Sequence, residues 1–150
     1  MLTSGFDHVA LLTADTDRLH DFYRHVFDAE VVHDDQLPDG GRLSFVRVGE
    51  SAEFNIFELP GNEEPVRRAP MFGRGRIDHL GLRAADLTSL RENRGRLVAA
   101  GASDGFVTDF GPVLSVFFVD PDGLEAEVCV ANPDAEPGEF HPPGTPARGF

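Results

Sequence analysis

Two histidines and two glutamates recur at matching places in the two halves of the chain. His8 lies early in the stretch F-D-H-V-A-L-L, and His79 lies early in I-D-H-L-G-L, 71 positions later. Each histidine is followed by a late glutamate, Glu58 after 50 residues and Glu127 after 48. Imidazole and carboxylate ligands together suit zinc, nickel, iron, cobalt or manganese. Four such ligands would leave coordination positions open for water or substrate, which is typical of catalytic metal sites.

The two histidines belong to a longer repeat. A shift of 71 positions also matches further pairs: Asp7 with Asp78, Leu11 with Leu82, Ala14 with Ala85, Asp15 with Asp86 and Leu19 with Leu90. Self-similarity at one fixed period indicates two copies of one module. Neither module alone could surround an ion with these ligands. We therefore expect two modules facing each other across a pseudo-twofold axis to present all four.

Each module is predicted to fold in the order β-α-β-β-β. In the first, residues 6–12 form a strand, and Asp15 can cap the helix that follows. The helix is indicated by apolar residues at helical spacing: Leu19, Phe22, Tyr23, Val26 and Phe27. Alternating apolar residues then predict strands at 30–34, 42–48 and 53–59.

The second module repeats this order after a linker at 60–76. A strand is predicted at 77–83, and a helix follows, capped by Asp86 and ended near Gly101. Its apolar face comprises Leu87, Leu90, Leu97 and Val98, and the later strands are expected at 103–110, 113–119 and 124–130. The modules thus span 1–59 and 77–131. The Pro- and Gly-rich tail at 132–150 is not expected to form a packed element.

The fold class that this order indicates is α+β, with the two tandem modules forming one curved mixed sheet around a metal-site cleft. A length of 150 residues and a hydrophobic content of 41% suit one compact domain of this kind. The formal charge of −13 argues against nucleic acid as a partner. No apolar run is long enough to span a membrane, and no secretory signal is visible. The single cysteine, Cys129, fits a reducing cytoplasm.

Other polar residues are interpreted as structural or as solvent-exposed. His20, His25 and His33 are read as surface residues, Glu125 as a carboxylate at the rim, and His141 as part of a disordered tail. Tyr23 continues the apolar face of its helix, and Cys129 has no basic neighbour in sequence that would activate its thiol. One basic cluster could steer an anionic substrate, although a linker at the surface explains it equally well: Arg67, Arg68, Arg74 and Arg76.

The repeated β-α-β-β-β order, the two D-H strands and the ending D-P-D-G-L-E-A-E-V resemble the vicinal oxygen chelate superfamily. This superfamily includes glyoxalase I, extradiol dioxygenases and bleomycin-resistance proteins, and the resemblance covers about residues 5–131. It implies that the metal ligands are His8, Glu58, His79 and Glu127, with Glu58 and Glu127 also catalytic. Glu127 rather than Glu125 aligns with the family's ligand. The resemblance also implies a homodimer.

Three functions follow from this resemblance. The first is a glyoxalase-like lyase or isomerase that acts on a small substrate with adjacent oxygens through a metal-stabilised enediolate, and its distinguishing feature is the fourth ligand, Glu58. The second is a non-haem iron dioxygenase that uses only His8, His79 and Glu127. Against this function, the later strands lack the additional histidine and tyrosine that assist catalysis in such dioxygenases. The third is a metal-free, drug-binding protein of the bleomycin-resistance type, against which the full ligand set argues.

Overall fold

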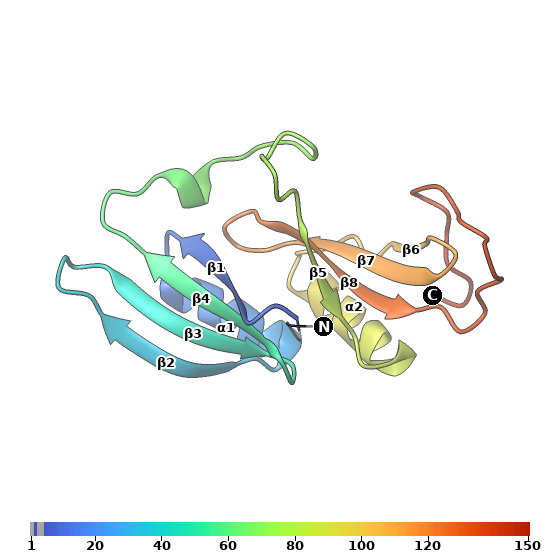
Figure 1. The fold of residues 1–150 in the computed structure, drawn as a ribbon, viewed down its shortest axis with the longest axis horizontal. Helices are drawn as coiled ribbons and strands as arrows, with labels where there is room; N and C mark the ends of the chain where they lie inside the picture. The colour runs from blue at the N-terminus through green and yellow to red at the C-terminus, as the bar shows by residue number, and fades with distance from the viewer. Residues whose placement is uncertain (1, 3–4) are drawn as a thin grey trace. The chain divides into compact units, whose positions relative to one another are not determined.

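The structure, a computed structural model, describes residue 2 and residues 5–150. The chain divides into two compact units. The first unit runs to Arg68 and also includes Pro121–Gly123, and the second comprises Ala69–Asp120 and Leu124–Phe150. Each unit contains one four-stranded sheet and one long helix (Figure 1).

The first unit has the predicted β-α-β-β-β order. Its elements are β1 (His8–Thr13), α1 (Thr16–Phe27), β2 (Glu30–Gln36), β3 (Arg42–Val48) and β4 (Ala52–Glu58). The sheet order is β1-β4-β3-β2, with β1 parallel to β4 and the other pairs antiparallel. A short 3-10 helix, η1 (Glu64–Val66), interrupts the segment predicted as a linker.

The second unit repeats this topology. Its elements are β5 (Leu80–Arg83), α2 (Leu87–Ala99), β6 (Val107–Asp109), β7 (Val113–Val119) and β8 (Glu125–Ala131). The sheet order is β5-β8-β7-β6, again with one parallel pair, β5 with β8. The α+β class and the two modules are confirmed. The strands form two four-stranded sheets, one per module, rather than one continuous sheet.

The two helices begin at the predicted caps. The side chain of Asp15 accepts a hydrogen bond from the Arg18 backbone N–H (3.0 Å), and the side chain of Asp86 accepts one from Ser89 N–H (2.7 Å). Since the repeat shift relates Asp15 to Asp86, the same cap serves both modules. α2 ends before Gly101, whose φ of +68° is the left-handed conformation that glycine tolerates.

Each helix covers one face of its own sheet. In the first unit, Leu19 and Tyr23 are about 1% exposed, and the Tyr23 ring meets the Phe54 ring edge-on at 5.2 Å. In the second, Leu90 and Leu97 are fully buried against β7 and β8. Burying each such side chain contributes roughly 1.5–3 kcal/mol. Val98, predicted on the buried face of α2, is 45% exposed, so the buried stripe is narrower than expected.

His20 also differs from its prediction as a surface residue, since it is only 3% exposed. Its Nε2 lies 2.8 Å from the Oγ of Ser44 on β3, so the ring has a buried hydrogen-bond partner. Burial holds the pKa of His20 below its ordinary value of 6.5, because a charged ring would lose its hydration there. Ser44 is 24 residues away in sequence, so this partner was not predictable from local pattern.

The turn between β7 and β8 packs within the first unit through Asp122. This residue is 7% exposed; its carboxylate accepts hydrogen bonds from Thr13 Oγ1 and Arg18 Nη2, both at 2.6 Å. Its carbonyl oxygen accepts another from Arg68. Gly123 follows with φ +89°, and a Cβ atom there would lie 1.0 Å from Arg68 Nη1. The positive φ therefore favours glycine here, and any other residue would also displace the Arg68 side chain.

The tail, predicted to be disordered, is ordered along the edge of the second sheet, and in Figure 1 it runs beside β6. It forms no helix or regular strand, but Asp109 N–H donates to Thr145 O (2.8 Å) and Ala147 N–H donates to Val107 O (3.0 Å). Thr108 and Pro146 form an isolated bridge between these bonds. The tail thus covers the otherwise unpaired edge of β6.

Candidate metal site in the second module

Strand alternation separates the two faces of the second sheet. On β8, Ala126, Val128 and Val130 are buried beneath α2, so Glu125, Glu127 and Cys129 occupy the opposite, open face. The parallel register pairs Gly81 with Glu127 and Arg83 with Cys129. His79, two residues before Gly81, is therefore on the same open face as Glu127.

The structure brings His79 and Glu127 together. The His79 Nε2 atom lies 3.4 Å from Glu127 Oε1, and both side chains are partly buried, at 31% and 18% exposure. A nitrogen and a carboxylate oxygen so placed are candidate ligands, one just before β5 and the other on β8. Among residues 2 and 5–150, no group of three or more histidine, cysteine, aspartate or glutamate side chains is arranged to hold a metal ion. This pair would therefore need a further ligand to complete a catalytic site.

Neighbouring groups fix the orientation of both residues. His79 Nδ1 donates to Asp78 Oδ2 at 3.0 Å, which directs Nε2 toward Glu127. Ser115 on β7 donates its hydroxyl proton to Glu127 Oε2, which leaves Oε1 facing the histidine. The hydrogen bond to Asp78, followed by the charge of Glu127, raises the pKa of His79, and the same bond lowers the pKa of Asp78. The imidazole and the carboxylate are thus both held by partners, as metal ligands commonly are.

The side chains closest to this pair are apolar or already paired. Phe117 meets the His79 ring edge-on at 5.9 Å, and Gly81 presents no side chain beside Glu127. Glu125 bonds Arg74 at 2.6 Å, which agrees with its assignment as a carboxylate outside the site. Burial raises the pKa of the Cys129 thiol to about 11, so this thiol is protonated and is no nucleophile at neutral pH.

His8 has the same local arrangement as His79. Its Nδ1 donates to Asp7 Oδ1 at 2.9 Å, as the repeat of the Asp-His pair predicts. The register of β1 with β4 then places Ala10, the equivalent of Gly81, beside Asn55. Asn55 therefore occupies the position in the first module that Glu127 has in the second. Its buried Oδ1 has no hydrogen-bond partner among the described residues.

Glu58 is not beside His8, and this corrects the predicted ligand set. In the β1–β4 register His8 pairs with Glu53, whereas Glu58 pairs with Thr13 at the opposite strand end. The separation is five residues, an odd number, so the two side chains also occupy opposite faces. Glu58 Oε2 instead accepts hydrogen bonds from Thr16 N–H (2.8 Å) and Oγ1 (2.7 Å). It stabilises the N-terminus of α1.

The larger hollow lies next to Glu58, not next to His79. It measures about 390 Å³ and is lined by Thr13, Ala14, Gly40, Glu58, Leu59, Pro60, Gly61 and Asn62. Its lining contains no histidine or cysteine, and its one carboxylate is committed to Thr16. A smaller groove of about 190 Å³ follows the open face of the second sheet. The groove is the better candidate, because its lining residue Gly81 is the register partner of Glu127.

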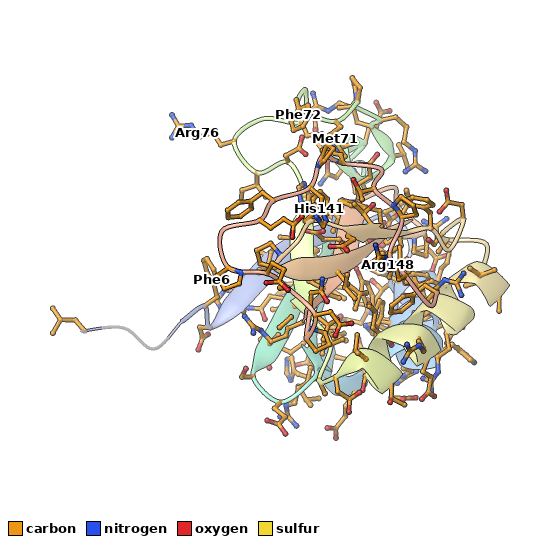
Figure 2. All side chains as sticks on the ribbon, turned by 90° about the vertical axis from the view of Figure 1, so that its right-hand side faces the viewer. Phe6, Met71, Phe72, Arg76, His141 and Arg148 are labelled. Atoms are coloured by element: carbon orange, nitrogen blue, oxygen red, sulfur yellow. The ribbon has the colours of Figure 1, made fainter. Side chains whose placement is uncertain are left out.

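The arginine cluster of the linker is mostly engaged. Arg67 pairs with Glu64 (3.0 Å), Arg68 with the Asp122 carbonyl, and Arg74 with Glu125. Arg76 projects from the linker loop in Figure 2. The other side chains behave largely as predicted. Tyr23 is in the core, and His25 is exposed. His33 is partly exposed and stacks on Phe45.

Comparisons with known proteins agree with this fold. The model of the Glyoxalase-like domain matches residues 8–129, which is most of the chain and includes both modules. The chain therefore belongs to the glyoxalase-like domain family, within the vicinal oxygen chelate superfamily. Among functionally curated proteins, none matches this sequence significantly.

Several crystal structures share the fold. The glyoxylase/bleomycin resistance protein/dioxygenase domain from Frankia sp. has a TM-score of 0.75 at 20% identity, over 87% of this chain and 99% of that chain. The glyoxalase family protein from Enterococcus faecalis scores 0.69 at 23% identity, over 86% and 99%. The fosfomycin resistance protein FosX from Listeria monocytogenes, in complex with Mn(II) and sulfate, scores 0.63 at 18% identity, over 87% and 95%.

No helix among the described residues is long and apolar enough to cross a membrane.

Proposed function

We propose that this protein is a divalent-metal-dependent enzyme that acts on a small substrate with two adjacent oxygen atoms. The observation that carries the proposal is the His79–Glu127 pair, whose facing atoms lie 3.4 Å apart on the open face of the second sheet. His79 and Glu127 are proposed as two ligands. His8 is proposed as the third, because the repeat makes it the equivalent of His79 and it has the same aspartate partner.

The donor set fits a borderline divalent ion such as zinc, nickel, iron, cobalt or manganese. When bound, the ion would act as a Lewis acid toward the substrate oxygens. FosX of Listeria monocytogenes offers a parallel, since a Glu-to-Gln mutant of it was crystallised with Mn(II) and 1S,2S-dihydroxypropylphosphonic acid, a molecule with adjacent hydroxyl groups. That parallel supports the substrate class rather than a particular substrate.

Glu127 is proposed as the residue that holds or moves a proton. Ser115 fixes its Oε2, so Oε1 is the oxygen directed toward the site. Glu58 has no part in this proposal, since it bonds Thr16 on the other face of the first sheet. The proposed reaction remains an isomerase or lyase type of proton transfer next to an oxyanion.

A non-haem iron dioxygenase is the second candidate, and one observation favours it. The position equivalent to Glu127 in the first module holds Asn55, so the ligand set reduces to two histidines and one carboxylate. This is the ligand set of many iron(II) oxygenases. Turnover that requires dioxygen would support the dioxygenase, whereas equal turnover without dioxygen would support the lyase or isomerase.

Calorimetric titration with Mn(II), Zn(II), Ni(II) and Fe(II) tests the metal-dependent proposal. We expect micromolar or tighter binding of at least one ion, and a loss of roughly 100-fold or more in H79A and E127Q. E125Q is the matched control, because Glu125 shares the strand and face of Glu127 but pairs with Arg74. No binding at micromolar concentrations, or equal losses in E125Q and E127Q, would contradict the proposal and favour the metal-free binding protein.

A further inference from the structure

Arg83 lies on the same sheet face as the His79–Glu127 pair. Gly81 and Arg83 face the same side of β5, and His79 lies just before this strand on that side. The register places Arg83 beside Cys129, the next open-face residue of β8 after Glu127. Four residues of extended chain separate the Cα atoms of His79 and Arg83 by roughly 13 Å. The flexible Arg83 side chain can cover part of that separation.

The 190 Å³ groove includes Arg83 and Gly81, the register partner of Glu127. It is lined by Gly81, Leu82, Arg83, Val113, Cys129, Val130 and Ala131. Arg83 is the one residue of this lining that is charged at neutral pH, and the other residues are small or apolar. A molecule lying in the groove would therefore meet mostly apolar surface together with the Arg83 guanidinium.

Arg83 differs from most arginines of this acidic chain in having no hydrogen-bond or ion-pair partner among the described residues. Acidic side chains outnumber basic ones by 26 to 13, and most arginines have a carboxylate or carbonyl partner. A net charge of −13 disfavours the approach of anions, so an anionic ligand needs a local cation to bind.

We propose that Arg83 binds an anionic group of the substrate, such as a carboxylate or phosphate, while the adjacent oxygens occupy the metal site. The substrate would thus be an anion with an apolar spacer of a few carbon atoms. This inference rests on the proposed function and adds the substrate class. Arginine suits the role, since its planar fork forms bidentate bonds with carboxylate and phosphate oxygens.

Two hydroxamates of equal chain length test it in the Mn(II)-loaded protein. A hydroxamate presents two adjacent oxygens to a metal. Adipic acid monohydroxamate adds a terminal carboxylate, whereas hexanohydroxamate ends in a methyl group. We expect calorimetry to show roughly 10-fold or greater preference for the carboxylate probe. R83Q should remove that preference while affinity for hexanohydroxamate and Mn(II) is unchanged, and R83K should retain part of it.

R76Q is the matched control, since Arg76 projects from the linker and does not line the groove. It should retain the full preference. Equal affinity for both probes in the wild type, or a preference that survives in R83Q, would overturn the role of Arg83 and leave the metal site standing. Absence of Mn(II) uptake together with absence of binding by either probe would overturn the proposed function and this inference together.

Discussion

Asp78 directly contacts His79, one of the proposed metal ligands. It holds Nδ1 of His79 at 3.0 Å and so determines which nitrogen faces Glu127. D78N retains the shape but weakens this bond, and we predict a loss of roughly 10- to 100-fold in metal affinity. D86N is the control, because asparagine caps a helix about as well as aspartate. Isothermal titration measures the metal affinity of both variants. Equal affinities in D78N and the wild type would show that Asp78 does not orient the ligand.

Glu58 should affect stability and not metal binding. E58Q exchanges a carboxylate for an amide at the N-terminus of α1, where Thr16 donates two hydrogen bonds. We predict a decrease of about 1 kcal/mol in the free energy of unfolding, with metal affinity unchanged. Urea denaturation and metal titration on the same sample measure the two quantities. Reduced metal affinity in a folded E58Q protein would restore Glu58 as a ligand.

The contrast between Glu58 and Glu127 shows what could be predicted at the scale of residues. Residue type and the 71-residue repeat were sufficient to select His79 and Glu127, which the structure brings together. The same reasoning failed for Glu58, because strand face depends on register, and a shift of one residue moves a side chain to the other face. Asn55 holds the equivalent position, and its residue type gave no signal of a ligand role.

At the scale of elements, the buried His20 links α1 to β3 and makes stability depend on pH. Its pKa is lowered in the folded protein, so the unfolded chain binds a proton more readily. The stability that the neutral, buried His20 ring contributes is fully present above pH 6.5, and it is lost as the pH falls below that value. We predict that the wild type loses more stability than H20Q between about pH 7.5 and about pH 5.5.

The difference between wild type and H20Q isolates His20, because His79 and His141, whose pKa values are raised, are present in both proteins. Urea denaturation at the two pH values is the measurement. H25Q, which changes an exposed histidine of the same helix, should behave like the wild type. An identical pH dependence in H20Q and wild type would show that the His20 ring is not the group responsible.

The β6 edge depends on the tail. Removing residues 133–150 would leave Asp109 N–H and Val107 O without their partners, Thr145 and Ala147. We predict a lower melting temperature and concentration-dependent aggregation, since an unpaired strand edge can bind other chains. Removing only Arg148–Phe150 retains those bonds and should have little effect. A longer truncation as stable and monodisperse as the full chain would show that the tail does not protect β6.

Element order was predictable, but the contacts of the tail were not. Period-2 and period-3.6 patterns located the strands and helices of the described residues to within a few residues. The least accurate prediction was β6, which has three residues where eight were expected. The tail lacks any such period, which correctly indicated no regular element. The tail residues that form backbone hydrogen bonds with β6 lie 36 or more residues from their partners in sequence. Composition does not encode such long-range pairing.

At the scale of the whole molecule, the two copies of the module differ at the proposed ligand positions. The second module has His79 and Glu127, and the first retains His8 but has Asn55 at the acidic position. We expect a homodimer, as the family resemblance implies. Light scattering should give twice the chain mass of 16.3 kDa. A mass of one chain at micromolar concentration would contradict this.

Anomalous diffraction from Mn(II)-soaked crystals tests the claim that His79 and Glu127 bind a divalent metal ion. We predict one strong peak about 2.0–2.3 Å from His79 Nε2 and from a Glu127 oxygen. R83Q crystals should show the same peak, because Arg83 is proposed to bind substrate and not metal. A peak at Glu58, or saturating Mn(II) with no density beside His79, would contradict the claim.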